Sequence, residues 1–397
     1  MHLCPRLRKA IFDDLSIAKT NLHVCIKLFK SFVEKGLKNV VLCPGSRSAP
    51  LALAAGGLAE SKDINLITSI DERSAAFFAL GLSKASSNAV AVITTSGTAV
   101  AELLPAAVEA DRSCIPLIFL TADRPKRLKD CGANQTVNQE IFLNPVCRFV
   151  GQTPTEGFHT ISDEEIKNIV NKIWAEFNYY PGPIHLNIPF EEPLYPSLYE
   201  QKYAWEKVQN EEKKKFLEIK KIEDINNKDL PLNFKNIDLE KPGILILGPW
   251  RGHDDDINFY NEIVRKLQDL SGWPIFADPL SQVEVDQPGL IYNWEILLST
   301  DFFKNLRNIN ILRLGPLSSS RKLEHWLSSI EGDQLLITEK DFRSLDPLKK
   351  SSQYNEGIKS WWLNYKCDKQ NFIINNFTKL FLKKCLKLDN FAEEWLD

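Results

Sequence analysis

The stretch "VVLCPGSRSAP" (residues 40–50) runs from an apolar segment into a turn that is rich in glycine, serine and arginine. The apolar part predicts a buried strand, and the residues after the turn predict a helix. Two interpretations fit the turn itself. Ser46 or Ser48 could cap the helix, or the turn could bind an anion, because a helix N-terminus carries partial positive charge and free N–H donors. Capping explains the serines but not Arg47, which the positive end of a helix disfavours.

Strand-like and helix-like segments alternate on both sides of this stretch, up to about residue 189. The strand-like segments are short, β-branched and bounded by turn residues, and they cover residues 39–43, 65–69, 90–95, 116–121 and 183–188. Apolar stripes with helical spacing cover residues 22–37, 72–85 and 97–110. Strands that are apolar on both faces and separated by helices indicate a parallel sheet covered on both sides. We therefore predict an α/β fold.

The same alternation restarts near residue 243, after a segment that is dense in alternating charge. Four more strands are expected at 243–248, 274–278, 309–315 and 334–338, with helices around 257–269 and 320–330. The charged segment is typical of a solvated linker, with room for a short helix. The expected organisation is an N-terminal extension (1–20), a first α/β domain (21–194), a charged linker (195–242), a smaller Rossmann-like middle domain (243–355) and a helical tail (356–397).

Composition excludes several classes of protein. The 397 residues carry a net charge of −3, which gives no reason to expect a nucleic-acid or anionic-membrane partner. No window approaches the ~20 apolar residues of a membrane span, and the N-terminus lacks the apolar core of a secretory signal. The eight cysteines include no C-x-x-C pair, so we expect a reducing, cytoplasmic setting.

Polar residues are concentrated in four loops that follow the predicted strands, at residues 44–48, 71–74, 95–99 and 121–135. In an open parallel sheet, ligands bind outside the carboxyl ends of the strands. The loops supply a glutamate, arginines, hydroxyls and a carboxamide, which suits a site that binds carboxylates and has one general acid or base. The G-x-G-x-x-G and P-loop signatures are absent, which argues against a dehydrogenase or a nucleotide triphosphatase.

Glu72 is the candidate acid or base, and it also has a simpler interpretation. Asp71 could cap the helix that follows, and Glu72 could interact favourably with the helix dipole. Alternatively, a glutamate in a water-poor corner between strand and helix could exchange a proton with a heteroaromatic ring. The position alone leaves both open.

Several ordered motifs resemble one enzyme family. The segments "PGSRSAPL", "DERSAAFFALGLSKA", "TTSGTAVAELLPAAVEA", "TADRP" and "DCGANQT" are similar to the first domain of the SEPHCHC synthases, which depend on thiamine diphosphate. The segments "SGWPIFADPLSQ" (271–282) and "LRLGPLSSSRKLEHWL" (312–327) are similar to their second domain. The resemblance covers roughly residues 20–350. It implies a pyrimidine-binding-type domain followed by a smaller Rossmann-like domain.

The resemblance also implies an activity. These transferases decarboxylate 2-oxoglutarate and add the thiamine-bound succinic semialdehyde unit to isochorismate, in menaquinone or phylloquinone biosynthesis. Carried over residue by residue, the family pattern makes Glu72 the catalytic residue, hydrogen-bonded to the aminopyrimidine ring of the cofactor. It implies substrate binding by Ser46, Arg47, Gln135, Arg321 and Lys322, and cofactor binding by Ser96, Gly97 and Thr98 beside Glu72. Both substrates are dicarboxylates, and a planar guanidinium suits carboxylates.

The basic pair in the second domain departs from the family pattern. Many relatives have lysine where this chain has Arg321, so the resemblance carries over the positive charge at this position but not a particular contact. The simpler interpretation of Arg321 and Lys322 is a solvated helix face.

A third family domain holds the diphosphate of the cofactor through Mg²⁺, with a Gly-Asp-Gly run and, further on, paired asparagines. Here the only Gly-Asp is Gly332–Asp333, and Gln334 follows it. We therefore expect no metal ligands, with the Mg²⁺ and diphosphate site of thiamine diphosphate outside this chain. The partner would be a second copy in a homodimer, or another chain that supplies the third domain. Trp361, Trp362 and Phe381 would then be poorly covered.

Three hypotheses follow. The chain is the N-terminal part of an active synthase and is inactive alone, or it is a non-catalytic remnant or binding module of that family. In the third hypothesis it is a sibling thiamine enzyme of the acetolactate synthase type, which would use a different set of arginines.

Overall fold

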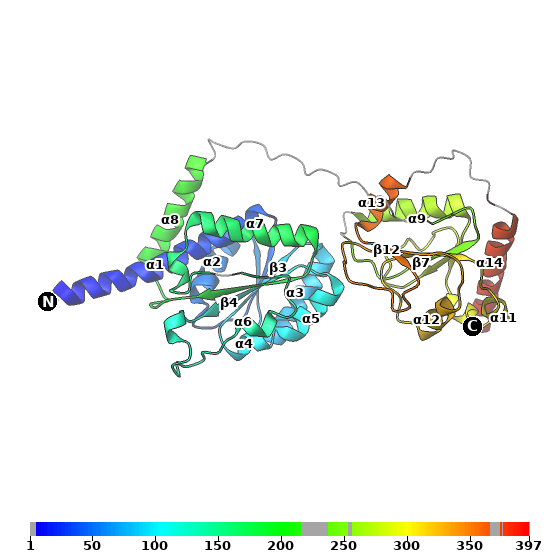
Figure 1. Cartoon of the computed structure of the whole chain (residues 1–397). Coiled ribbons are helices and arrows are strands. Elements are labelled where there is room, and N and C mark those ends of the chain that lie inside the picture. The colour runs from blue at the N-terminus through cyan, green and yellow to red at the C-terminus, as the bar shows by residue number, and fades with distance from the viewer. Residues whose placement is uncertain are drawn as a thin grey trace. The chain divides into compact units, whose positions relative to one another are not determined.

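The computed structural model describes residues 5–151, 153–215, 237–252, 256–365, 374 and 376–396. The chain divides into two compact units, Met1–Asp224 and Ile225–Asp397. Each unit contains one six-stranded sheet in which all strand pairs are parallel (Figure 1). The predicted α/β fold is confirmed. No helix among the described residues is long and apolar enough to cross a membrane.

The sheet of the first unit has the strand order β2-β1-β3-β4-β6-β5. Its strands are β1 (Asn39–Leu42), β2 (Asn65–Thr68), β3 (Val90–Thr94), β4 (Leu117–Asp123), β5 (Phe149–Gly151) and β6 (Pro183–Pro189). All residues of β3, β4 and β6 are buried, as expected for central strands of a sheet that is covered on both faces. The carboxyl ends of the six strands therefore lie along one edge.

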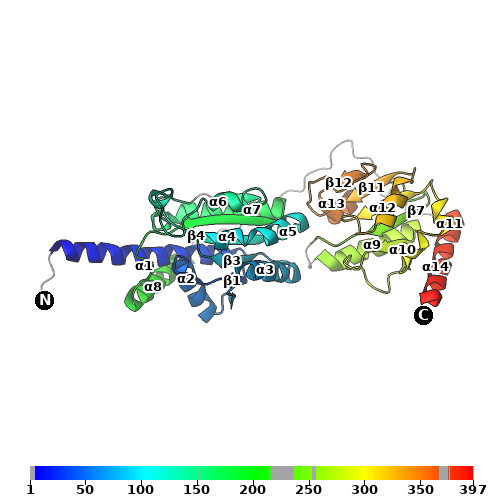
Figure 2. The same ribbon diagram turned by 90° about the horizontal axis from the view of Figure 1, so that it is seen from below.

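Two layers of helices cover this sheet (Figures 1 and 2). One apolar core lies between the sheet and the helices α1 (Pro5–Glu34), α2 (Ala49–Glu60) and α7 (Asp163–Tyr179). A second core lies on the other face, beneath α3 (Glu72–Ser86), α4 (Thr98–Ala101), α5 (Leu104–Ser113) and α6 (Glu140–Leu143). Several strand-end loops lead directly into these helices, so helix packing fixes where the loops lie.

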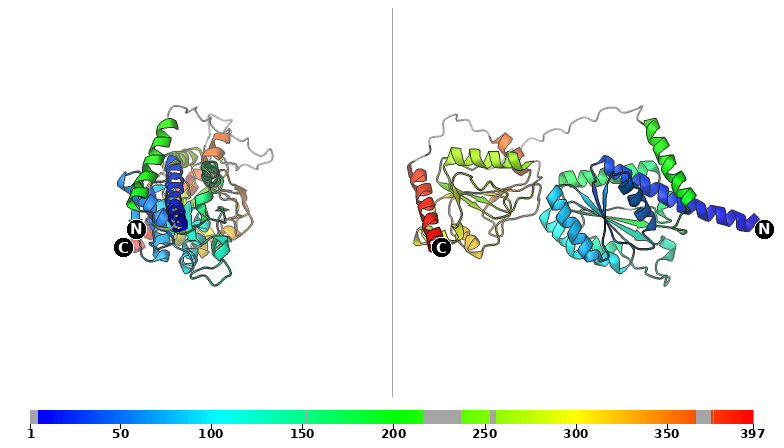
Figure 3. Two further views of the ribbon diagram at one scale, coloured as in Figure 1. Left: turned by 90° about the vertical axis from the view of Figure 1, so that its left-hand side faces the viewer. Right: turned by 180° about the vertical axis from the view of Figure 1, so that it is seen from behind.

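Helix α8 (Leu198–Lys215) lies against α1 within the first unit (Figure 3). Ala204 and Val208 of α8 are buried in the same core as α1. The segment 195–242, which we expected to be a charged linker, therefore begins with a helix that packs on the first unit. The remainder of its most charged part, residues 216–236, lies outside the described residues.

The sheet of the second unit has the order β12-β11-β10-β7-β8-β9. Its strands are β7 (Gly243–Leu247), β8 (Ile275–Ala277), β9 (Leu290–Ile291), β10 (Asn310–Leu314), β11 (Gln334–Ile337) and β12 (Ser352–Tyr354). Helices α9 (Ile257–Ser271) and α13 (Gly357–Asn364) contribute to the core on one face. Helices α10 (Trp294–Leu297), α11 (Asp301–Lys304), α12 (Arg321–Ser328) and α14 (Asn376–Leu396) contribute to the core on the other.

The cores of the second unit are rich in tryptophan. Trp273 and Trp361 are fully buried in one core, and Trp294 and Trp326 are buried in the other. Phe381 of α14 is only 3% exposed and packs among the aromatic rings of the second core. The expectation that the tail aromatics are poorly covered is therefore wrong for Trp361 and Phe381, because helices α13 and α14 fold back onto the sheet of their own unit.

Candidate active site at the strand ends of the first unit

The loops after β1, β3 and β4 are packed directly on one another. A side-chain Cβ at Gly45 would lie within 2.9 Å of Thr95 Oγ1, so only glycine allows the first two loops to approach this closely. Gly97 has a φ of +85°, and a Cβ there would lie 3.3 Å from the side chain of Gln135. Three of the four polar loops predicted from the sequence are thus brought together.

Arg47 lies in this cluster and is buried. One guanidinium nitrogen, Nη2, donates to Glu192 Oε1 at 2.6 Å, and the other, Nη1, donates to the carbonyl oxygen of Phe190 at 3.1 Å. The Arg47 side chain is 9% exposed, whereas the Glu192 side chain is 63% exposed. A guanidinium that is nearly enclosed by protein requires a counter-ion, and Glu192 supplies one from the loop after β6.

The backbone that carries Glu192 is held on both sides. The N–H of Phe190 donates to the carbonyl oxygen of Asp123 at 2.9 Å, and Asn21 Nδ2 donates to the carbonyl oxygen of Glu191 at 2.8 Å. Arg127 binds the Glu191 carboxylate with two hydrogen bonds of 2.6 and 3.0 Å. These contacts fix the main chain at residues 190 and 191.

Ser46 and Gln135 are exposed at this edge. Ser46 Oγ accepts a hydrogen bond of 3.0 Å from the hydroxyl of Tyr195. Gln135 has a φ of +57°, and its carbonyl oxygen accepts hydrogen bonds from Arg124 and from Ser96 Oγ. The Gln135 backbone is therefore fixed, and its side chain remains accessible to a ligand.

Arg124 is a second buried guanidinium in the cluster. Its Nη1 donates to Ser96 Oγ at 2.5 Å and to the carbonyl oxygen of Gln135 at 2.8 Å. Burial and the nearby positive charge of Arg47 lower the pKa of Arg124, and the carboxylates of Asp123 and Glu192 partly oppose this effect. The two arginines and Glu192 are thus close enough to interact electrostatically. Arg124 belongs to the segment "TADRP" (121–125), but it was not among the substrate-binding residues expected from the sequence.

A buried network of neutral polar groups supports these loops. Gln139 Oε1 accepts from the N–H of Gly97 at 2.9 Å, and Gln139 Nε2 donates to Asn187 Oδ1 at 2.7 Å. Thr121 also donates to Asn187 Oδ1, so its hydroxyl oxygen must accept from Nε2–H of His185. His185 is thereby fixed as one neutral tautomer, and burial lowers its pKa to about 4.

The sequence reasoning missed Gln139 and Asn187. Both are buried polar residues next to segments that the sequence did identify: Gln139 stands four residues after Gln135, and Asn187 lies in β6. A carboxamide within an otherwise apolar central strand was the available signal, because a buried amide requires hydrogen-bond partners.

A cleft of about 770 Å³ opens beside the network, at the carboxyl ends of β4, β5 and β6. Arg124, Lys129 and Asn187 are among the residues that line it. Lys129 forms ion pairs with Asp123, at 3.0 Å, and with Glu140. Burial is the largest single effect on the pKa of Lys129 and lowers it, but the hydrogen bonds and ion pairs with Glu140 and Asp123 together outweigh burial and raise this pKa.

Glu72 is the first residue of α3 and is half-buried, so it is not enclosed within its own unit. Asp71 caps the helix through a 2.7 Å hydrogen bond from Ser74 N, and hydrogen bonds from Ser74 lower the pKa of Asp71. Among the described residues, the Glu72 carboxylate has no hydrogen-bond partner. Burial, and then the negative charges of Glu72 and Asp71, raise the pKa of Cys43 to about 12, which shows that Glu72 lies near the end of β1.

The capping interpretation of the first turn is wrong for the serines. Ser48 occupies the N-cap position of α2, but its side chain makes no capping hydrogen bond. Its hydroxyl donates instead to the carbonyl oxygen of Gly45 at 3.0 Å, which tightens the turn.

The remaining cofactor candidates belong to the loop after β3. Ser96 and Gly97 are buried, and Thr98 is exposed at the start of α4. In the second unit, Arg321 and Lys322 are exposed in the first turn of α12, which Ser320 caps through the N–H of Leu323. They make a solvent-exposed basic pair.

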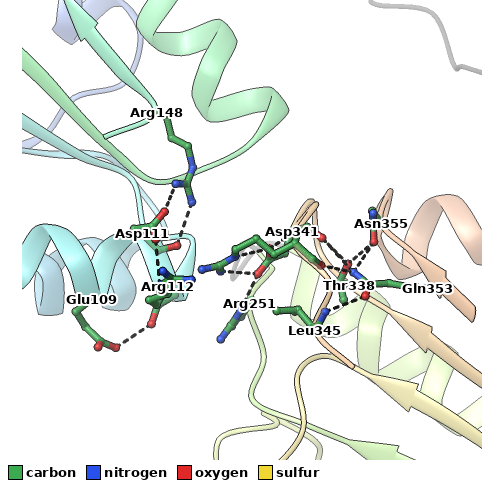
Figure 4. A network of polar contacts seen from close by, with 12 residues as sticks. Glu109, Asp111, Arg112, Arg148, Arg251, Thr338, Asp341, Leu345, Gln353 and Asn355 are labelled. Carbon is green, nitrogen blue, oxygen red and sulfur yellow. Dashed lines mark hydrogen bonds and ion pairs between the residues drawn. The ribbon is translucent and has the colours of Figure 1, made fainter. Parts of the chain in front are cut away.

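The strand ends of the second unit are closed by their own backbone. A Cβ at Gly315 would lie 2.9 Å from the carbonyl oxygen of Pro249, and a Cβ at Gly248 would overlap Pro316. The cavity beneath has a volume of about 10 Å³, enough for one water molecule. At its rim, Asp341 accepts hydrogen bonds from Arg251 and Arg343 (Figure 4).

This arrangement offers one unpaired carboxylate, Glu72, and a cluster of two buried arginines within one set of loops. The first suits a heterocycle that exchanges a proton, and the second suits a ligand carboxylate. Among the described residues, no group of three or more His, Cys, Asp or Glu side chains could hold a metal ion. The half-buried Glu72 carboxylate is the described group that fits the aminopyrimidine ring of thiamine diphosphate.

Comparison with known proteins gives the same picture. Residues 27–142 match the family model described as "Thiamine pyrophosphate enzyme, N-terminal TPP binding domain". This range contains all four polar loops. Residues 27–142 therefore form a domain of that type within the first unit.

Curated relatives extend the similarity over most of the chain. A protein of Prochlorococcus marinus (strain MIT 9313) named "2-succinyl-5-enolpyruvyl-6-hydroxy-3-cyclohexene-1-carboxylate synthase" is 50% identical over 368 residues, 91% of this chain and 63% of that relative. A protein of the same name from P. marinus (strain NATL2A) is 47% identical over 96% of this chain and 64% of its own length. Another from Synechococcus sp. (strain WH7803) is 50% identical over 85% of this chain and 58% of its own length. The chain thus spans less than two thirds of these relatives.

Proposed function

The chain is homologous over most of its length to the 2-succinyl-5-enolpyruvyl-6-hydroxy-3-cyclohexene-1-carboxylate synthases, and from this premise we propose that it supplies the pyrimidine-binding and middle domains of such an enzyme. The proposed reaction joins the decarboxylated four-carbon unit of 2-oxoglutarate to isochorismate and releases carbon dioxide, a step of menaquinone or phylloquinone biosynthesis. The observation that carries the proposal is the grouping of Arg47, Arg124 and Gln135 at one sheet edge, with Glu72 near the end of β1.

Glu72 would hold the aminopyrimidine ring of thiamine diphosphate and exchange a proton with a ring nitrogen. When bound, the cofactor supplies the carbon nucleophile and stores the electron pair that decarboxylation releases. Ser96, Gly97 and Thr98 would form the wall beside the ring, with the Gly97 N–H held in place by Gln139. Because Glu72 is half-buried here, the water-poor setting that favours proton transfer would come from a surface packed over α3.

The substrates would bind through their carboxylates. Arg47 is the proposed clamp for isochorismate, with Ser46 and the Gln135 side chain beside it and Arg124 behind them. Two buried guanidinium groups favour a dianionic ligand and disfavour a neutral one. Arg321 and Lys322 remain proposed contacts for the same substrate.

The active enzyme would contain a further polypeptide surface that supplies the Mg²⁺-diphosphate site, from a second copy in a homodimer or from another chain. The exposed apolar side chains near Glu72 support this proposal: Ile70, Phe77 and Phe78 are 88%, 44% and 49% exposed. We place the synthase in the cytoplasm, where free thiols such as Cys25 and Cys43 stay reduced.

Reconstitution tests the proposal. The chain would be co-expressed with the part of the P. marinus MIT 9313 relative that it does not match. Carbon dioxide release from 2-oxoglutarate would then be measured with and without isochorismate, thiamine diphosphate and Mg²⁺. We expect release that requires all of these components.

Two results would contradict this function. Isochorismate binding without any turnover would instead indicate a binding module. Turnover of a 2-oxo acid that does not depend on isochorismate would indicate a sibling thiamine enzyme of the acetolactate synthase type.

A further inference from the structure

The two side chains of the Arg47–Glu192 ion pair differ strongly in burial and in their number of contacts. Arg47 is enclosed and makes a second hydrogen bond to the carbonyl oxygen of Phe190, so its guanidinium has one fixed place. Glu192 projects a side chain that is 63% exposed from a backbone anchored by its neighbours. The Glu192 side chain can therefore leave the guanidinium without any movement of the main chain.

The Glu192 carboxylate also acts on the second arginine of the cluster. The negative charge of Glu192 opposes the fall in the pKa of Arg124, and the positive charge of Arg47 contributes to that fall. A single carboxylate thus lies where it interacts favourably with both guanidinium groups. A ligand carboxylate that binds Arg47 would occupy the same place.

We propose that Glu192 is an internal stand-in for a substrate carboxylate. While the site is empty, the Glu192 carboxylate neutralises Arg47. When the ligand carboxylate binds the guanidinium in its place, the Glu192 side chain rotates outward towards solvent. This inference rests on the proposed function, because it takes a dicarboxylate as the ligand. It assigns to Glu192 a role in ligand selection and none in proton transfer.

The replacement of Glu192 by a ligand carboxylate is physically reasonable. A buried guanidinium without a counter-ion would destabilise the empty site, whereas an ion pair with one exposed partner is weak enough to be displaced. Only a ligand with its own negative charge can replace Glu192 without leaving Arg47 unpaired. A neutral ligand of the same shape would therefore be rejected.

Calorimetric titration of the full chain with isochorismate tests the proposal. Removing the competing charge in Glu192→Gln should lower Kd by about threefold to tenfold, in line with the strength of partly exposed ion pairs. Glu192→Ala should act in the same direction. The matched control is Glu164→Gln in the first turn of α7, where the same change of charge on an exposed glutamate should leave Kd unchanged. Thermal unfolding of each variant checks that the fold is kept.

The double variant Arg47→Ala, Glu192→Gln separates this inference from the proposed function. If Glu192 acts mainly through Arg47, its substitution should have a much smaller effect on Kd once Arg47 is gone. An unchanged or higher Kd in Glu192→Gln, with binding lost in Arg47→Ala, would overturn the stand-in and leave the function intact. If neither the natural chain nor any variant binds isochorismate, the stand-in fails, and turnover of the reconstituted enzyme then decides the proposed function separately.

Discussion

At the scale of single residues, the site is defined by which charges have partners and which do not. Arg47 and Arg124 are buried and hydrogen-bonded, whereas the Glu72 carboxylate has no hydrogen-bond partner among the described residues. A charged group without protein partners, next to a set of fixed loops, is available to a ligand.

Glu72→Gln should lower the turnover of a reconstituted enzyme by at least about 100-fold, because a carboxamide cannot exchange a proton with the ring. The fold should be unaffected, since Asp71 and not Glu72 caps α3. Carbon dioxide release measures turnover, and circular dichroism measures the fold. Turnover equal to that of the natural chain would remove Glu72 from the mechanism.

Arg47→Lys should raise KM for isochorismate by about tenfold and KM for 2-oxoglutarate by less. Lysine keeps the charge but loses the planar fork that binds two oxygens at once. Steady-state kinetics of the reconstituted enzyme with each substrate varied in turn would measure both constants. Equal increases in the two KM values would count against Arg47 as the isochorismate clamp.

At the scale of elements, most strands were predictable, including the edge strand β2 at residues 65–69, whereas the shortest edge strands were not. The segments 39–43 and 90–95 carry short apolar runs, 309–315 is mainly apolar, and each contains a strand. The edge strands β5, β9 and β12 have only two or three residues each, too few to form a pattern. They are strands because a neighbouring strand offers hydrogen bonds, which sequence periodicity does not record.

The same limit applies to the site. The position of Arg47 at a strand end was visible in the sequence, but its partner Glu192 follows it by 145 residues. The pair exists because the topology brings the loop after β6 to the loop after β1. Sequence spacing therefore identified the loops but not their mutual contacts.

The packing of the first two loops gives a prediction at this scale. Gly45→Ala should destabilise the first unit by about 1 to 3 kcal/mol, because the new Cβ would clash with Thr95. The control is Gly56→Ala within α2, where a Cβ has open space; this change should be neutral or stabilising by up to about 1 kcal/mol. Urea unfolding followed by circular dichroism compares the two. Equal effects at both positions would show that the loops move apart easily.

At the scale of the whole molecule, the two units carry buried groups that respond to pH in opposite directions. Burial lowers the pKa of His185 in the first unit to about 4. In the second unit, burial raises the pKa of Glu339, which accepts a hydrogen bond from Ile358 N, to about 7. The stability that depends on neutral His185 is present above its unfolded pKa and is lost as pH falls towards 4. The stability that depends on protonated Glu339 is present at low pH and is lost as pH rises through 7.

Between pH 7 and pH 5, these groups should therefore weaken the first unit and strengthen the second, each by about 2 kcal/mol. Hydrogen exchange resolved by peptide would follow each unit separately. His185→Gln should remove the change in the first unit, and Glu339→Gln should remove the change in the second. If both units shift in the same direction, and the variants do not alter this, the two buried groups do not govern the pH response.

The tryptophan-rich cores have a practical consequence for experiments. Seven of the nine tryptophans belong to the second unit, and only Trp174 and Trp205 belong to the first. Intrinsic fluorescence during denaturation would therefore report mainly the loss of the second unit. A chain whose first unit had already melted would still emit much like the native protein, so fluorescence alone would overstate how long the strand-end loops of the first unit survive.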